Sequence, residues 1–219
     1  MKRANIVPIN IMDMLSKKKD DYISTSQIQF QNHDVFIDSE ITDPENYREF
    51  LSILFNANEN DTINLFINSG GGNLDTAMAI IEGLKSTSAH TTAIIIGACH
   101  SAASMISMYC HEMAVMDNAY SMVHTATAGS YGNVGNAESQ AIFTSKQVEK
   151  LLYETYCGFL TESELERVKQ GVEYWFNAEE IKERMNKRVE FIQKREEAME
   201  KAERKTSKSK GKKEKDLEL

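Results

Sequence analysis

Three segments of the sequence carry residue types that could do chemistry. The first is a Ser-Gly-Gly-Gly run at residues 69–72. Glycines between a strand and a helix let the backbone turn sharply and bring N–H groups close to a ligand. Three consecutive glycines exceed what a tight turn for packing needs, so this segment favours a functional use. It is not a phosphate loop, because the Gly-Lys-Ser/Thr ending is absent.

The second segment is a run of small residues at 97–105, Gly-Ala-Cys-His-Ser-Ala-Ala-Ser-Met. A serine at such a strand-to-helix junction suits nucleophilic attack, because its hydroxyl projects from the turn and the next N–H faces a developing oxyanion. The alternative is a helix cap flanked by small residues for close packing. This segment alone leaves both interpretations open.

The third segment ends at His124, which follows the apolar residues 120–123 and precedes a glycine-containing loop at 129–135. A histidine at the end of a strand can act as a general base. His100 and His111 are alternative candidates, and a purely structural histidine is the plain alternative. Metal-ligand spacing such as HExxH is absent, so we do not expect metal catalysis. We also expect no cofactor in the chain itself.

The elements around these segments alternate between strand and helix. Apolar runs between turn residues predict strands, and apolar residues at i, i+3, i+4 and i+7 predict helices. A capping box at 161–164 marks one helix start. The alternation predicts an α/β fold with crossover helices. Strands are expected near 34–37, 62–68, 91–97, 113–116 and 121–124, and helices at 45–56, 74–85, from about 103, at 136–159, from 161 and from 177.

Composition restricts the class of protein. The length of 219 residues fits one domain with appendages, and a net charge of -8 argues against a nucleic-acid binder. No apolar stretch is long enough to span a membrane, and no apolar signal region follows the charged N-terminus. Three widely spaced cysteines fit reduced thiols, so we expect a cytoplasmic protein.

The two ends differ from the middle of the chain. Residues 201–216 hold eight Lys or Arg against three Asp or Glu, without aromatic residues. Such a segment cannot bury enough apolar surface to fold alone, so 192–219 is predicted to be a charged, disordered tail, with an RNA- or partner-binding arm as the alternative. Residues 1–33 are predicted to be an N-terminal arm, and 34–191 the folded domain.

Taken together, the motifs resemble the proteolytic subunit of the Clp protease (ClpP). The family's order and spacing are matched by Ile-Asn-Ser-Gly-Gly-Gly at 67–72, Ser-Ala-Ala-Ser-Met at 101–105 and Met-Val-His at 122–124. Residues 173–180, Glu-Tyr-Trp-Phe-Asn-Ala-Glu-Glu, resemble the segment with the third triad member. The resemblance covers about 34–184. It implies a ClpP/crotonase-like fold of repeated β-β-α and βαβ units with a long handle helix at 136–159.

The resemblance also implies a serine endopeptidase with a Ser-His-acid mechanism and an apolar P1 preference. Asp117 is an alternative to Glu173 as the carboxylate that orients His124. The implied roles are Ser104 as nucleophile, His124 as general base, Glu173 as the acid in place of the family's Asp, and the N–H groups of Met105 and of Gly71 or Gly72 as the oxyanion hole.

Three positions depart from the family pattern. Gly70 stands where the family has Pro in the glycine turn, and Thr125-Ala126 stands where it has Gln-Pro after the histidine. The family's Arg beside the triad acid has no match here. Gly70 affects the rigidity of the glycine turn, and Thr125-Ala126 affects binding of the substrate strand. The missing Arg affects the pairing of rings.

Assembly and partners follow from the same resemblance. It implies a homo-oligomeric ring, a heptamer or two stacked heptamers, whose chamber receives unfolded polypeptides from an AAA+ unfoldase that uses ATP. Membranes and nucleic acids are not expected partners. The alternatives are a catalytically silent ClpP-like ring subunit, a phage head maturation protease, and a crotonase-fold acyl-CoA enzyme, which would need no Ser-His pair.

Overall fold

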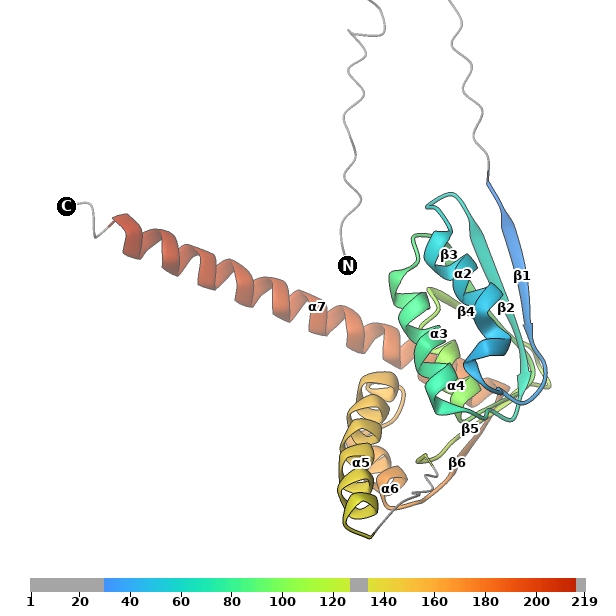
Figure 1. Ribbon diagram of the computed structural model, residues 1–219. Helices are drawn as coiled ribbons and strands as arrows, with labels where there is room; N and C mark the ends of the chain where they lie inside the picture. Colours follow the sequence, from blue (N-terminus) through green and yellow to red (C-terminus); the bar gives the residue numbers. More distant parts are fainter. Residues whose placement is uncertain (1–29, 127–133, 216–219) are drawn as a thin grey trace, which may run out of the picture. The chain divides into compact units, whose positions relative to one another are not determined.

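The computed structural model describes residues 30–126 and 134–215 (Figure 1). A six-stranded sheet has the order β1-β2-β3-β5-β6, and β4 pairs with β3 beside this path. Every pair is parallel except β5–β6. The prediction of an α/β fold is confirmed, whereas β6 was not among the predicted strands. The strands are β1 (Asn32–Ile37), β2 (Thr62–Ser69), β3 (His90–His100), β4 (Glu112–Val115), β5 (Tyr120–Val123) and β6 (Tyr174–Asn177).

The helices agree with the sequence pattern to within a few residues at most ends. Helices α2, α3 and α4 cover one face of the sheet (Figure 1). The expected helix at 45–56 begins as a 3-10 turn, η1 (Pro44–Tyr47). The α-helices are α2 (Arg48–Asn56), α3 (Leu74–Ser86), α4 (Ala102–Ser107), α5 (Val134–Tyr156), α6 (Glu162–Lys169) and α7 (Ala178–Lys215).

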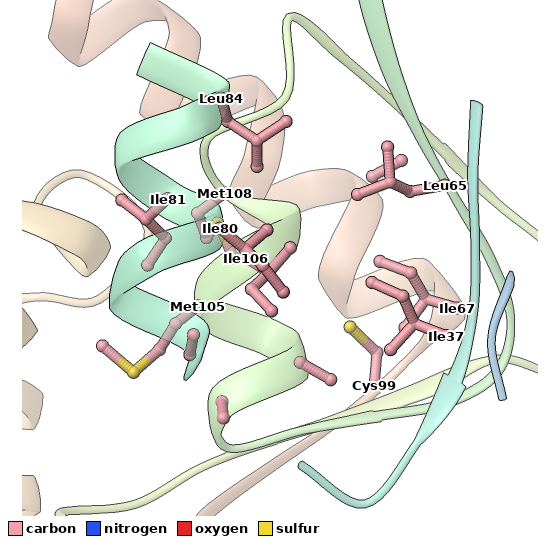
Figure 2. Packing of buried hydrophobic residues seen from close by; sticks show 14 of the residues in the cluster. Ile37, Leu65, Ile67, Ile80, Ile81, Leu84, Cys99, Met105, Ile106 and Met108 are labelled. Carbon is pink, nitrogen blue, oxygen red and sulfur yellow. The ribbon is translucent and has the colours of Figure 1, made fainter. Parts of the chain in front are cut away.

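The core lies between the sheet and these helices because alternate strand residues face them. In β2 the odd-numbered residues Ile63, Leu65 and Ile67 are fully buried, while their neighbours are partly or fully exposed. This period of two fits a sheet with one covered face. Figure 2 shows helix side chains facing strand side chains: Ile80, Leu84 and Ile106 on one side, and Ile37, Leu65 and Ile67 on the other.

An irregularity in β3 places its end beside the glycine turn. The register against β2 shifts between the pairs Ile67↔Ile95 and Ser69↔Cys99, so β3 has two extra residues there. The Asn68 side chain accepts a hydrogen bond from the Ala98 N–H at 3.0 Å, which satisfies the displaced backbone. Gly97 makes room, since a Cβ there would lie 2.3 Å from the Asn68 side-chain oxygen.

The C-terminal segment differs from the prediction of a disordered tail. Residues 192–215 continue helix α7. Ala, Glu and Lys favour helices, and the i,i+4 ion pairs Lys194–Glu190 and Lys201–Glu197 add support. The sequence argument considered burial but not this local propensity. Most of the predicted arm, 1–29, and residues 216–219 lie outside the described residues.

No helix within the described ranges is both long and apolar enough to cross a membrane.

One ion pair fastens α6 and β6 to α7. The Arg184 guanidinium donates to both carboxylate oxygens of Glu164, at 3.0 and 2.8 Å, and to the carbonyl of Phe159 at 3.0 Å. It also lies 4.6 Å from the centre of the Phe176 ring on β6. Bidentate pairing combined with ring stacking is specific to arginine. This contact holds β6, and therefore Glu173 just before it, against the domain.

Replacing Glu164 should change how stability depends on pH. Hydrogen bonds from Arg184 lower the pKa of Glu164 to about 2 from its ordinary 4.5. A lowered pKa gives a stabilisation that is complete above about pH 4.5 and is lost as the pH falls towards 2. Glu164→Gln should therefore lower the urea midpoint at pH 7 and lose less stability on acidification than the wild type. Exposed Glu162→Gln is the matched control, and equal pH profiles for wild type and Glu164→Gln would contradict this account.

Candidate active site

The turn from β3 into α4 holds Ser101 in an unusual backbone conformation. Ser101 has φ 52° and ψ -122°, the only positive φ outside glycine among the described residues. Such a conformation costs about 1–3 kcal/mol and persists only when its surroundings impose it. Here the Ser101 N–H donates to the Met122 carbonyl at 2.8 Å, and its carbonyl accepts from the Met105 N–H at 3.0 Å. The strained turn projects the Ser101 side chain as in a nucleophile elbow.

Ser101 is the serine that meets the histidine. Its Oγ lies 2.7 Å from Nε2 of His124, just after β5, and both residues are partly exposed. Strands β3 and β5 bring the two together, because His100, the last residue of β3 and the one before Ser101, pairs with Met122, which is two residues before His124. With the imidazole proton on Nδ1, the hydroxyl donates to Nε2, the arrangement required for a nucleophile and its general base.

Ser104 lies elsewhere, contrary to the pairing with His124 predicted from the resemblance. It is fully buried in α4, and its Oγ accepts a hydrogen bond from the Tyr156 hydroxyl at 3.1 Å and one from Ser121 at 3.4 Å. One helical turn separates it from Ser101, so only Ser101 stands at the strand-to-helix junction. In this structure Ser104 joins α4 to α5 and β5.

The glycine turn packs directly against Ser101. Gly71 has φ 93°, and a Cβ there would lie 2.7 Å from the His100 carbonyl oxygen and 2.8 Å from Cβ of Ser101. A Cβ on Gly72, which has φ 146°, would lie 2.2 Å from the carbonyl oxygen of Ile41. Both glycines are therefore required for close approach, whereas Gly70 faces open space.

The predicted oxyanion donors are not equally available. The Met105 N–H is used inside α4 by the Ser101 carbonyl, which argues against the role predicted for it. The Gly71 N–H donates to Ser69 Oγ at 3.1 Å. For Gly72 no acceptor is found among the described residues, and Ala102 stands at the first position of α4, where N–H groups have no intrahelical partner. Gly72 and Ala102 thus offer the free donors.

Glu173 lies near the pair without touching it. Continuing the antiparallel register from Val123↔Tyr174 places Glu173 opposite His124, with both side chains on one face of the sheet. Its Oε2 accepts a hydrogen bond from the indole N–H of Trp175 at 3.3 Å. No carboxylate within the described ranges lies within 4.0 Å of a His124 ring nitrogen, so the third role of Glu173 stays a prediction.

The other candidate residues have different partners. Asp117 is almost fully exposed and pairs with Lys182 at 3.4 Å. His111 Nδ1 is engaged by the Thr91 backbone and hydroxyl, at 3.1 and 2.8 Å. The His100 ring packs on Tyr120 and Trp175, with centroids 4.9 and 5.0 Å apart. Burial lowers the pKa of both histidines, and neither contacts a serine in the described contacts.

A cavity of about 540 Å³ opens at the Ser101–His124 pair. The pair, Gly72 and Ala102 line one side, and apolar side chains of α4 and α5 line another. This apolar part can take an aliphatic or aromatic side chain. It consists of Met105, Val148, Leu151 and Leu152.

Other chemistries find less support in this region. No cluster of three metal-ligating side chains occurs within the described part of the chain. Burial raises the pKa of the nearby Cys99 thiol to about 12, so it is not a thiolate at neutral pH. The hydroxyl of Ser101 is therefore the nucleophile that the geometry favours.

A family model described as Clp protease matches residues 16–184, more than half of the chain. The chain belongs to the Clp protease family. Membership confirms the ClpP-like α/β fold and implies a peptidase, in a family that is generally of the serine type and generally forms oligomeric rings. The matched range contains Ser101, His124 and Glu173.

The sequence prediction chose Ser104 instead of Ser101 because it matched the family's Ala-Ala-Ser-Met motif, in which the serine is the nucleophile. The available signal was position: Ser is a preferred residue immediately before a helix, and Ser101 directly precedes α4. For this Clp family member, the place in the turn selects between two serines in the same motif. Ala102 was missed for the same reason, because the oxyanion donor is the backbone N–H of the residue that follows the nucleophile.

The two neighbouring glycines should respond differently to alanine. Gly71→Ala adds a Cβ against the His100 and Ser101 backbone at a positive φ, and we expect a loss of about 2–5 kcal/mol in the free energy of unfolding. Gly70→Ala is the matched control and should stay within about 0.5 kcal/mol, because nothing lies near its Cβ. Urea unfolding at equal protein concentration measures both, and equal effects would contradict the packing described.

Proposed function

We propose that this chain is a serine endopeptidase of the Clp type in which Ser101 is the nucleophile and His124 the general base. The observation that carries the proposal is the 2.7 Å contact between Ser101 Oγ and His124 Nε2 at a strained turn that opens onto a cavity. Retention of a geometrically intact pair favours an enzyme over a silent ring subunit. No cofactor is needed for this chemistry.

The reaction runs in two transfers. Ser101 Oγ attacks the peptide carbonyl carbon while its proton passes to His124 Nε2. As the tetrahedral intermediate collapses, the C–N bond breaks and the imidazolium gives that proton to the leaving amine, forming an acyl-enzyme. Water then attacks the ester, His124 takes its proton, and a second collapse returns the proton to Ser101 Oγ and releases the carboxylic product.

Two backbone donors are proposed for the developing oxyanion. Ala102 and Gly72, whose N–H groups are the proposed donors, line the same cavity as Ser101. Donors fixed by the backbone require little reorganisation when charge develops, and losing one costs about 10²–10³ in rate. Ala102 replaces Met105 of the initial hypothesis, and of the two glycines that it named Gly72 is kept.

Glu173 is proposed to complete the triad by accepting a hydrogen bond from His124 Nδ1. A carboxylate in this position selects the imidazole tautomer and stabilises the imidazolium. The β5–β6 register supports the proposal, since it puts Glu173 opposite His124. A glutamate reaches farther than the family's aspartate by one methylene.

Substrate and assembly are proposed from the same site and family. The apolar cavity wall favours an apolar P1 side chain in an unfolded polypeptide. Ring formation, with a heptamer or stacked heptamers as the expected states, is supported by family membership and by exposed apolar residues on α5. An AAA+ unfoldase that uses ATP would supply substrate. The exposed residues are Ile142, Phe143 and Tyr153.

Replacing Ser101 and replacing Ser104 should have different effects on activity and on stability. Ser101→Ala should lower kcat for a fluorogenic peptide with P1 Leu by roughly 10⁶-fold, as loss of a triad nucleophile does. Ser104→Ala leaves the buried Tyr156 hydroxyl without this acceptor, so it should lower the free energy of unfolding by about 1–3 kcal/mol. It should nonetheless keep activity within about tenfold. Loss of activity in folded Ser104→Ala, with activity retained in Ser101→Ala, would overturn the assignment.

A further inference from the structure

Trp175 contacts both the proposed acid and the segment that carries the proposed nucleophile. Its indole N–H donates to Glu173 Oε2 at 3.3 Å, and its ring meets the His100 ring edge-on with centroids 5.0 Å apart. His100 is the residue immediately before Ser101. Glu173 and Trp175 are two positions apart along the β6 segment, so their side chains share a face of the sheet.

Trp175 is more than half exposed, at 55%. A tryptophan on the surface has a large apolar area in water, so its contacts with Glu173 and His100 call for a reason beyond core packing. The register pairs Met122 with Trp175 and Val123 with Tyr174, and continuing it by one more pair puts His124 opposite Glu173. The indole thus stands next to the His124–Glu173 position along the same strand pair.

We propose that Trp175 is a positioning residue for Glu173, a step that rests on the proposed function. The indole N–H holds Oε2 of the carboxylate and leaves Oε1 available to His124 Nδ1. A glutamate has one more rotatable bond than an aspartate, so an exposed Glu173 loses more side-chain entropy when it is fixed beside the imidazole. A hydrogen bond to one oxygen restricts that freedom before the imidazolium forms. The bond explains how a glutamate can take an aspartate's place.

The decisive variants are Trp175→Phe, Glu173→Ala and the double variant. Trp175→Phe keeps a ring beside His100 and removes the N–H donor. We expect it to lower kcat about tenfold, the scale of one hydrogen bond to a charged group, with KM nearly unchanged. Glu173→Ala should lower kcat further, and adding Trp175→Phe to it should have no additional effect, because the indole acts through the carboxylate.

Tyr120→Leu is the matched control. Tyr120 is also exposed and also packs on the His100 ring, but none of its described contacts involves Glu173. It should keep wild-type kcat. If Tyr120→Leu lowers kcat as much as Trp175→Phe, or if Trp175→Phe still lowers kcat in the Glu173→Ala background, Trp175 acts by packing and the proposal is overturned.

Fluorescence provides a readout that does not depend on activity. Trp175 is the only tryptophan in the chain. Glu173→Ala should release the indole and lower its steady-state anisotropy, while Glu179→Ala, on an exposed residue of α7, should not. Unchanged anisotropy in Glu173→Ala would overturn the contact.

The combined results separate this proposal from the proposed function. Wild-type kcat in Trp175→Phe together with a large loss in Glu173→Ala would overturn the positioning role and leave the peptidase intact. Full activity in Ser101→Ala would overturn Ser101 as the nucleophile, and no peptide hydrolysis by the assembled wild type would overturn the peptidase assignment itself, whatever the anisotropy shows. A tenfold loss in Trp175→Phe that vanishes without Glu173 supports both.

Discussion

The backbone at Ser101 is the constraint on which the site depends. A serine at φ 52° is strained, and its surroundings impose that conformation. The Met122 carbonyl holds its N–H, helix α4 holds its carbonyl, and Gly71 fits against its Cβ where no larger residue could. The two extra residues in β3, satisfied by Asn68, bring the strand end to this point. The conformation of the turn is therefore imposed jointly by residues of β2, β3 and β5.

A buried network of hydrogen bonds around Ser104 holds helix α4, and with it the turn at Ser101, in place. Ser104 accepts hydrogen bonds from Tyr156 of α5 and Ser121 of β5, and Ser107 donates to the Ser104 carbonyl at 2.8 Å. Buried polar groups must be paired, so the network fixes α4 against its neighbours. The same helix α5 supplies an apolar wall of the cavity. The serine first assigned to chemistry therefore has a structural part in the same site.

Local patterns were enough to predict most of the fold. Continuous apolar runs and alternation gave β1 to β5, and the capping box at Thr161 predicted α6, where both of its hydrogen bonds are present. Strand β6 is only four residues long, and it forms because Arg184 and the antiparallel partner β5 hold it. The strand propensity of Tyr174, Trp175 and Phe176 was an available signal, but the pairing with β5 is non-local and no local pattern could indicate it.

The site was predictable in its segments but not in its pairing. Spacing located the glycine turn, the serine-containing run and His124, because each interrupts an apolar element. Choosing between Ser101 and Ser104 required the residue at which α4 begins, and helix ends are the least certain feature of a sequence pattern. The role proposed for Trp175 could not be predicted from the sequence, because it depends on the register between β5 and β6.

The central claim is that Ser101 is the activated serine, and covalent labelling with a fluorophosphonate tests it most directly. Such a probe reacts with a serine hydroxyl that a neighbouring base activates. Peptide mapping of the labelled full-length protein should find one adduct, on Ser101, that is lost in His124→Ala and kept in Ser104→Ala. An adduct on Ser104, or equal labelling of wild type and His124→Ala, would contradict the account.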